Sequence, residues 1–222
     1  MRTAAILPMK AFKDAKQRLA ATLGAGHRRA LVEAMYSDVL VAARRTSMLD
    51  AIFVVTGDRA VARIAEQSDA TVIDDTGASH SEAARLGIEQ ALAGGFHRVL
   101  LIPGDCPLLD PAQLDALLAR PVDGGERSAL VIPDRHGTGT NGLLLSPPDA
   151  LTPAFGLGSC RRHMELAADQ GATSEVVEVP TLGLDIDTPE DLDTLRRTLA
   201  STRGGAAHTR GMIRQLDRTG AR

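Results

Sequence analysis

The chain has no tryptophan, one tyrosine and four phenylalanines, and only two of its 222 residues are cysteines. So few aromatic rings leave little on which unpaired bases could stack, which disfavours nucleic acid as a partner. Two cysteines, Cys106 and Cys160, cannot build a disulfide framework and are typical of a reducing compartment. Cys160 and His163 have the spacing of a metal pair, but two ligands do not make a zinc site. We therefore interpret both cysteines as packing residues.

Long apolar runs and an excess of one charge are also absent. No stretch approaches the roughly 20 apolar residues of a membrane span, and the N-terminus lacks the features of a signal peptide. The 25 basic and 28 acidic residues leave a net charge of −3, so no overall field attracts nucleic acid or an anionic membrane. We expect a cytoplasmic protein with small-molecule substrates. Its oligomeric state stays open, a homodimer included.

Lysine is scarce and confined to one place. The three lysines, Lys10, Lys13 and Lys16, all follow the first apolar run, whereas the other 22 basic residues are arginines. An ammonium is a compact point charge and does not replace a planar guanidinium. Together with Arg18, these lysines could neutralise a triphosphate and a leaving pyrophosphate. The alternative is a solvated surface loop, as most charge runs are.

Apolar runs typical of strands alternate with helical patterns. We place strands at residues 4–7, 51–56, 70–73, 98–103, 129–133, 142–145 and 175–179, and helices at 27–45, 60–67, 81–93, 112–118, 161–168 and 189–199. This alternation predicts a mostly parallel, doubly wound α/β sheet. The connection between 133 and 142 is too short for a crossover helix, so that pair should be antiparallel and the sheet mixed. We expect a single domain over residues 1–200 and a mobile tail over 201–222, where large apolar residues become rare.

Three aspartates follow apolar segments at positions where such sheets bind ligands. Asp105 lies between two prolines after the 98–103 run, a suitable place for a hard divalent cation, although Asp105 could instead only satisfy a turn. Alternation puts Asp185 and Asp187 on one face of an extended segment, so both carboxylates can reach one metal ion. Asp110 and Thr188, each followed by proline, are better explained as helix N-caps.

Several glycine and serine positions suggest anion binding. Ser159, after Gly156 and Gly158, is placed to begin a helix whose free N–H groups would attract an anion. Arg161 and Arg162 in its first turn are unfavourable for the helix dipole, a conflict that a bound anion would resolve. The alternative is a poorly optimised helix start. Residues 138–141 could form a second anion-binding nest, and Ser79 with Glu82 matches a capping box.

Together these segments resemble a known family. The chain resembles, over roughly residues 3–199, the guanylyltransferases that make the phospholactyl or phosphoenolpyruvyl guanosine intermediate in the biosynthesis of coenzyme F-420. The resemblance rests on Pro8-x-Lys10, Ala15-Lys16-x-Arg18-Leu19, Val55-Thr56-Gly57-Asp58, Ile102-Pro103-Gly104-Asp105-Cys106-Pro107, Pro133-Asp134-Arg135-x-Gly137-Thr138-x-Thr140-Asn141, Phe155-Gly156-x-Gly158-Ser159 and Asp185-Ile186-Asp187-Thr188-Pro189.

The resemblance implies a glycosyltransferase-A-like nucleotidyltransferase (Rossmann-like) fold that uses GTP and magnesium, expected as two ions. It implies acceptor-binding roles for Thr140, Gly156 and Ser159, catalytic roles for Lys16, Arg18 and Asp105, metal ligation by Asp105, Asp185 and Asp187, and nucleotide contacts from Pro8, Lys10, Lys16, Ser79, Ser81 and Gly104. Residues 77–82 are expected near the guanine. The Ala- and Arg-rich composition suggests a bacterium, and bacterial members resemble phosphoenolpyruvate users, so we favour phosphoenolpyruvate as acceptor.

Other functions remain open at this stage. The acceptor could be 2-phospho-L-lactate. Molybdopterin nucleotidyltransferases share the fold and the Thr-Pro-Glu-Asp stretch, but they usually have a glycine-rich loop where this chain has Pro8-Met9-Lys10. A nucleotide-binding regulatory domain without turnover is an alternative of another class, which the two carboxylate clusters disfavour. A generic glycosyltransferase is disfavoured because position 107, where an Asp-x-Asp motif needs its second aspartate, is proline.

Overall fold

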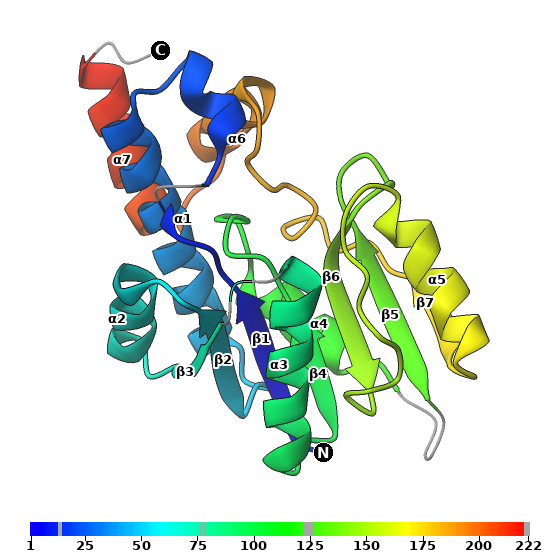
Figure 1. The fold of residues 1–222 in the computed structure, drawn as a ribbon. Coiled ribbons are helices and arrows are strands. Elements are labelled where there is room, and N and C mark those ends of the chain that lie inside the picture. The colour runs from blue at the N-terminus through cyan, green and yellow to red at the C-terminus, as the bar shows by residue number, and fades with distance from the viewer. Residues whose placement is uncertain (13–14, 76, 78, 122–126, 220–222) are drawn as a thin grey trace.

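The structure, a computed structural model, describes residues 1–12, 15–75, 77, 79–121 and 127–219. Seven strands form one sheet in the order β3-β2-β1-β4-β6-β5-β7 (Figure 1). They are β1 (Thr3–Pro8), β2 (Ala51–Thr56), β3 (Thr71–Asp74), β4 (Arg98–Leu101), β5 (Ser128–Pro133), β6 (Thr140–Ser146) and β7 (Thr173–Val176). Every pair is parallel except the two that β6 makes, with β4 and β5. The predicted mixed sheet and its antiparallel pair are therefore confirmed.

Helices cover both faces of this sheet. They are η2 (Gln17–Ala21, a 3₁₀ helix), α1 (Ala25–Arg45), α2 (Arg59–Gln67), α3 (His80–Ala93), α4 (Pro111–Leu118), α5 (Ser159–Asp169), α6 (Pro189–Ser201) and α7 (Ala207–Thr219). Along β1, Ala5 and Leu7 pack into one core with α1 and α4, whereas Ala4 and Ile6 pack into a second core with α3. This alternation is the two-residue period of a strand that is buried on both faces.

Close packing of α3 on β1 places the start of α3 beside the carboxyl end of β1. A Cβ atom at Gly87, in the middle of α3, would collide with the side chain of Ile6. Glycine is therefore required for this helix to lie so near the strand. The N-cap of α3, Ser79, accepts a hydrogen bond from the Glu82 N–H at 3.1 Å, which is one half of the expected capping box. The Glu82 side chain pairs with Arg85 instead of completing the box.

The C-terminal segment differs from the tail expected over residues 201–222. Residues 207–219 form α7, which packs on α1 and buries Met212, Ile213 and Leu216 (Figure 1). The buried Asp38 of α1 accepts hydrogen bonds from the backbone N–H groups of residues 208 and 209, and so caps α7 from another element. The expectation is corrected from a mobile tail to a packed helix, because three apolar residues at helical spacing suffice when α1 offers a matching face.

Smaller differences concern element ends and the cysteines. The last strand lies at 173–176 instead of 175–179, and Val177 still donates a hydrogen bond to Val131 in β5. Cys106 and Cys160 are both buried, in agreement with their interpretation as packing residues. Among the described residues, no helix combines the length and the apolar character that crossing a membrane requires.

Candidate active site

Three carboxylates converge beyond the carboxyl end of β4. Oxygen atoms of Asp105, Asp185 and Asp187 lie within 4.8 Å of one another. Asp185 and Asp187 flank Ile186, which is fully buried in the core, so the extended segment directs both acids to the same side as expected. The loop after β4 and the segment before α6 thus meet at the sheet edge where α/β proteins bind ligands.

Lys16 balances this negative charge. Its Nζ donates to Asp105 Oδ2 and, at 2.5 Å, to Asp187 Oδ1, and its side chain is only 8% exposed. Burial alone would lower the pKa of Lys16, but the two carboxylates outweigh burial and raise the pKa above its usual value. Lys16 has left-handed backbone angles, φ 56° and ψ 43°, which cost a non-glycine residue about 1–2 kcal/mol. Such strain is concentrated at functional sites.

Asp185 is oriented by a neighbour, Asn141, that the sequence marked only as part of a motif and of the expected nest at residues 138–141. Asn141, in β6, donates through Nδ2 to Asp185 Oδ1 at 3.1 Å and to the Leu182 carbonyl at 3.0 Å. Burial and the nearby charge of Asp105 raise the pKa of Asp185, and the bond from Asn141 partly offsets this rise. A group that holds three acids so close needs cations near it.

The donor set fits a divalent cation. Asp105 Oδ1 is buried and has no hydrogen-bond partner among the residues that the structure describes, although buried carboxylate oxygens are normally satisfied. Together with Asp185 and Asp187 it offers the oxygen ligands that magnesium prefers. Asp105 therefore does more than satisfy a turn.

A cavity of about 450 Å³ opens beside the carboxylates. It brings together the three predicted acceptor positions Thr140, Gly156 and Ser159 and the acids Asp105, Asp185 and Asp187. The other lining residues come from the start of α3, the loop after β4, the loop after β5, β6 and the loop before α5: Ser79, His80, Ser81, Pro103, Asp134, Gly139, Asn141 and Phe155. Phosphate-binding and metal-binding candidates from distant parts of the sequence thus line one space.

A second cavity of about 410 Å³ adjoins the first through Ser79. It lies between the loops after β1, β2 and β3, and its lining residues are Met9, Lys10, Ala11, Gly57, Asp58, Asp75, Gly77 and Ser79. Gly57 approaches this loop closely, since a Cβ atom there would lie 3.0 Å from the Asp75 carbonyl oxygen. The predicted Lys10 and Ser79 therefore share a space with Asp58, which belongs to the Val55-Thr56-Gly57-Asp58 motif, and with Asp75, which the sequence reasoning did not name.

Other predicted site residues lie outside these cavities. Arg18 is exposed on η2 and lines neither space. Gly104 is buried beneath Met9 and Tyr36, where a Cβ atom would lie 2.7 Å from the Met9 sulfur, so it serves close packing. Pro8 is buried at the end of β1. Lys13 lies outside the described residues.

One predicted anion site is already satisfied by the chain itself. Asp134 accepts hydrogen bonds from the backbone N–H groups of residues 136, 138 and 139, so the expected nest holds a carboxylate of the protein. That expectation was wrong, because Asp134 was overlooked as a competing anion. Arg162 donates to the Ala154 and Leu157 carbonyls, and Arg161 pairs with Glu165 at 3.6 Å. The dipole conflict at the start of α5 is thus relieved without a bound anion.

A hydrogen-bonded link behind Thr140 was also missed. His163 of α5 is fully buried, and its Nδ1 lies 2.9 Å from Thr140 Oγ1. Its Nε2 accepts from the Ala154 N–H at 2.9 Å. The sequence drew attention to His163 only as a partner of Cys160. The one available signal was a histidine on the apolar face of a predicted helix, which is a weak indication.

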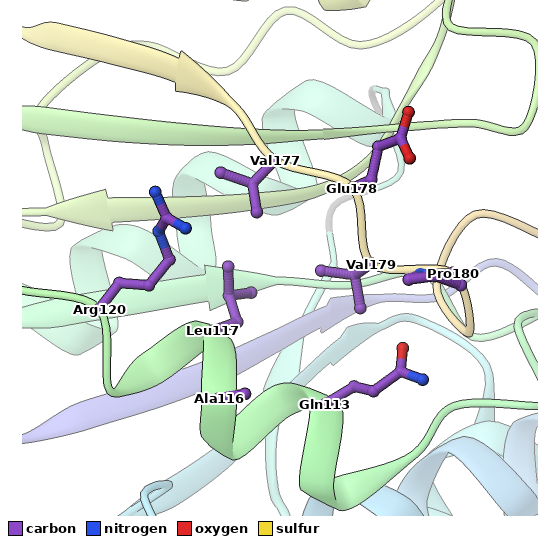
Figure 2. A pocket seen from close by; sticks show the side chains of 8 residues that line it. All are labelled: Gln113, Ala116, Leu117, Arg120, Val177, Glu178, Val179 and Pro180. Atoms are coloured by element: carbon purple, nitrogen blue, oxygen red, sulfur yellow. The ribbon is translucent and has the colours of Figure 1, made fainter.

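A third cavity, of about 240 Å³, lies apart from this site (Figure 2). It is formed between α4 and the segment after β7, by Gln113, Ala116, Leu117, Arg120, Val177, Glu178, Val179 and Pro180. Its polar side chains are partly engaged elsewhere: Arg120 binds Glu175 at 2.6 Å, and Gln113 accepts from Thr181 at 3.0 Å. It shares no lining residue with the carboxylate cavity.

Comparison with solved structures supports the fold. A nucleotidyl transferase of the genus Methanothermobacter superposes with a TM-score of 0.65 at 18% identity and covers 91% of this chain and 99% of its own. At this identity the likeness shows the fold alone. The expected nucleotidyltransferase-type fold is confirmed.

Sequence relatives identify the family. A phosphoenolpyruvate guanylyltransferase of Conexibacter woesei is 54% identical over 99% of this chain and 98% of its own length. A 2-phospho-L-lactate guanylyltransferase of Methanothermobacter thermautotrophicus is 33% identical over 97% of this chain and 92% of its own. The family model described as "Guanylyl transferase CofC like" matches residues 3–217. The chain therefore belongs to the CofC-like guanylyl transferase family.

Proposed function

We propose that this chain transfers GMP from GTP to phosphoenolpyruvate with release of pyrophosphate, in coenzyme F-420 biosynthesis. The observation that carries the proposal is one cavity that joins the carboxylate group to Thr140, Gly156 and Ser159. The 54% identity to a relative named phosphoenolpyruvate guanylyltransferase, over nearly the whole of both chains, supports this acceptor.

The reaction needs no general base from the protein. The acceptor is itself a phosphate, whose second pKa is about 6, so it is largely ionised at neutral pH. The difficulty is instead to bring two anions together and to align the attacking oxygen with the α-phosphorus. Asp105, Asp185 and Asp187 would hold magnesium. When bound, magnesium supplies the positive charge that screens both anions and the departing pyrophosphate in an in-line displacement.

Lys16 has a second role in this proposal. In the structure it neutralises Asp105 and Asp187. With a divalent cation held by those carboxylates, the ammonium of Lys16 would be free to contact the β- and γ-phosphates, and Arg18 lies two residues further on. A flexible point charge suits this exchange better than a planar guanidinium would.

The second cavity is our candidate for the base. Asp58 and Asp75 line it. Carboxylates only accept hydrogen bonds, and they match the adjacent N1–H and 2-amino donors of guanine. This cavity adjoins the carboxylate cavity at Ser79, so a nucleotide could place its base in one and its phosphates in the other.

The test is pyrophosphate release with magnesium and GTP. Phosphoenolpyruvate, 2-phospho-L-lactate, 3-phospho-D-glycerate and no acceptor are compared, with Asp105→Asn as the inactive control. We expect release that depends on phosphoenolpyruvate and is lost in the variant. Preference for either other phosphate would replace the acceptor and keep the nucleotidyl transfer. No release with any acceptor would reject the proposal.

A further inference from the structure

We infer that His163 is a positioning residue of the acceptor site: it fixes the Thr140 hydroxyl as a hydrogen-bond donor toward the acceptor and ties the loop before α5 to β6. The inference rests on the proposed function, because it concerns the side of the cavity where that function places the acceptor. His163 itself does not line the cavity.

The hydrogen bonds around His163 determine where its proton lies. The Ala154 N–H can only donate, so Nε2, at 2.9 Å, must accept and carry no hydrogen. In a neutral imidazole the proton is then on Nδ1, which donates to Thr140 Oγ1 at 2.9 Å. The ring is therefore held in the Nδ1–H form.

This arrangement leaves the Thr140 hydroxyl with a defined task. Its oxygen already accepts from His163, so its own hydrogen cannot point back at the ring. Thr140 lines the cavity beside Gly156 and Ser159. Its O–H is therefore available as a donor to a phosphate or carboxylate oxygen of the acceptor. If the ring had the other tautomer, Thr140 would donate to Nδ1 and be lost to the acceptor.

The same ring holds the neighbouring loop. Phe155 lies edge-on between His163 and His80, with ring centroids 5.1 Å and 4.9 Å apart. The Phe155 N–H donates to Ser81 Oγ at 3.0 Å. The loop is thus bound by α5 through His163 and by α3 through Ser81, and Gly156 follows at once with a φ of 119° that suits glycine alone.

Burial keeps His163 neutral and so preserves its hydrogen bonds to Ala154 and Thr140. The side chain is fully buried, which lowers its pKa to about 4, and the charge of Arg162 adds to this effect. A protonated ring would lose its acceptor for Ala154. No side chain other than histidine offers a donor and an acceptor on opposite sides of one rigid ring.

The experiment uses matched variants of the full chain. His163→Asn keeps an N–H near the position of Nδ1, whereas His163→Gln and His163→Ala do not. We expect His163→Ala and Thr140→Val each to raise KM for the acceptor about tenfold while KM for GTP changes less than about twofold. His163→Asn should recover most of the loss, and His163→Ala combined with Thr140→Val should be no worse than either alone, because both break one chain of bonds.

A measurement without turnover separates the inference from the proposed function. The ¹⁵N shifts of His163, assigned by comparison with His163→Asn, should show the Nδ1–H form at pH 7. The Nε2–H form would overturn the inference even if phosphoenolpyruvate is the substrate. Equal increases in both KM values, or additive effects in the double variant, would also overturn it, since they indicate a general structural role. If no acceptor is turned over, the proposed function fails and the acceptor role of His163 fails with it, whatever the tautomer.

Discussion

The carboxylates beyond β4 are stabilised by a charge, whereas the polar groups between β6 and α5 are stabilised by neutral hydrogen bonds. On the carboxylate side (Asp105, Asp185, Asp187 and Lys16), Lys16 bridges two acids, and one oxygen of Asp105 has no hydrogen-bond partner within the described part of the chain. On the acceptor side (Thr140, Phe155, Ser159 and His163), the buried groups donate and accept without a net charge. The first arrangement can exchange one cation for another, but the second can only orient.

The difference has a physical basis. Charged groups in a partly buried site interact strongly and respond to whatever ion enters, because water screens them poorly there. A buried neutral hydrogen bond gains little by exchange, and leaving its donor unpaired costs about 1–3 kcal/mol. Changes on the carboxylate side should therefore affect metal binding and turnover, and changes on the acceptor side should affect affinity for one substrate.

The largest expected effect comes from Asp105→Asn. Removing this charge takes away one of the three carboxylates that we propose hold magnesium, and should reduce kcat by about 1,000-fold or more, with weaker magnesium binding. Pyrophosphate release and titration with the metal alone measure the two quantities. Asp110→Asn is the matched control, since Asp110 caps α4 and asparagine caps equally well. Full activity of Asp105→Asn would remove the carboxylate side from the mechanism.

Lys16→Ala should reduce kcat by about 100-fold, because the departing pyrophosphate loses a positioned charge. It should also lower the free energy of unfolding in metal-free buffer by about 2 kcal/mol, as two acids lose their counter-ion and Asp187 is 46% exposed. Magnesium should restore part of this stability.

Arg29→Ala is the control for Lys16→Ala, because it removes one positive charge from the exposed surface of α1. It should change neither kcat nor the free energy of unfolding. Lys13→Ala is expected to have little effect. Equal, small effects of alanine at Lys10, Lys13 and Lys16 would instead support the alternative that this segment is a solvated surface loop.

A substitution far from both the carboxylate side and the acceptor side tests whether a loss of stability alone alters activity. Leu216→Ala in α7 deletes a fully buried side chain and should lower the free energy of unfolding by about 3 kcal/mol. Both KM values should stay at their wild-type level at 20 °C. Denaturant unfolding and steady-state kinetics check this prediction. No loss of stability would mean that α7 does not pack in solution as the structure has it.

Protonation of His163 in mild acid should lower the free energy of unfolding. The pKa of His163 is about 4 in the folded protein against 6.5 for an ordinary histidine, so the unfolded chain binds more protons between these values. Stability is therefore full above pH 6.5 and falls as the pH drops, by about 2 kcal/mol at pH 5. Measuring the free energy of unfolding of the wild type and of His163→Asn at pH 8 and pH 5 isolates the contribution of His163. Identical pH slopes would contradict the neutral, buried ring.

The smallest expected effect is that of Ser81→Ala, which cuts one link between the loop before α5 and α3. The Phe155 N–H loses its partner, which should cost about 1 kcal/mol of stability and raise both KM values about threefold. An effect on only one substrate would mean that Ser81 serves that side alone. Thermal unfolding and steady-state kinetics provide the measurement.

Local pattern made much of the site predictable. Asp105, Asp185 and Asp187 follow apolar segments, and the position of strand ends in a doubly wound sheet brings such residues together. Thr140, Gly156 and Ser159, which the family resemblance implied as acceptor positions, line one cavity. Arg18 and Gly104 line neither cavity and stay predictions, because spacing does not reveal whether a side chain faces a cavity or a neighbouring helix.

Three residues whose contacts the sequence reasoning did not predict share another property. Asn141, Asp134 and His163 act through partners in other elements or through loop amides, and no periodicity marks such contacts. The helix at 207–219 was missed for a related reason. Its apolar residues are few, and their value depends on the face that α1 presents and on Asp38, far away in the chain.

The sequence by itself determined the order of the strands and of the α-helices through α6, the mixed sheet, the N-caps at Asp110 and Thr188 and the gathering of acids at one edge, because hydrophobic period, proline position and strand ends are local properties. Only the tertiary structure decided that Lys16 bridges Asp105 and Asp187, that Asp134 fills the expected nest, and that His163 holds Thr140. Those contacts join residues up to 171 positions apart, and hydrogen bonds at such separations depend on how the elements pack.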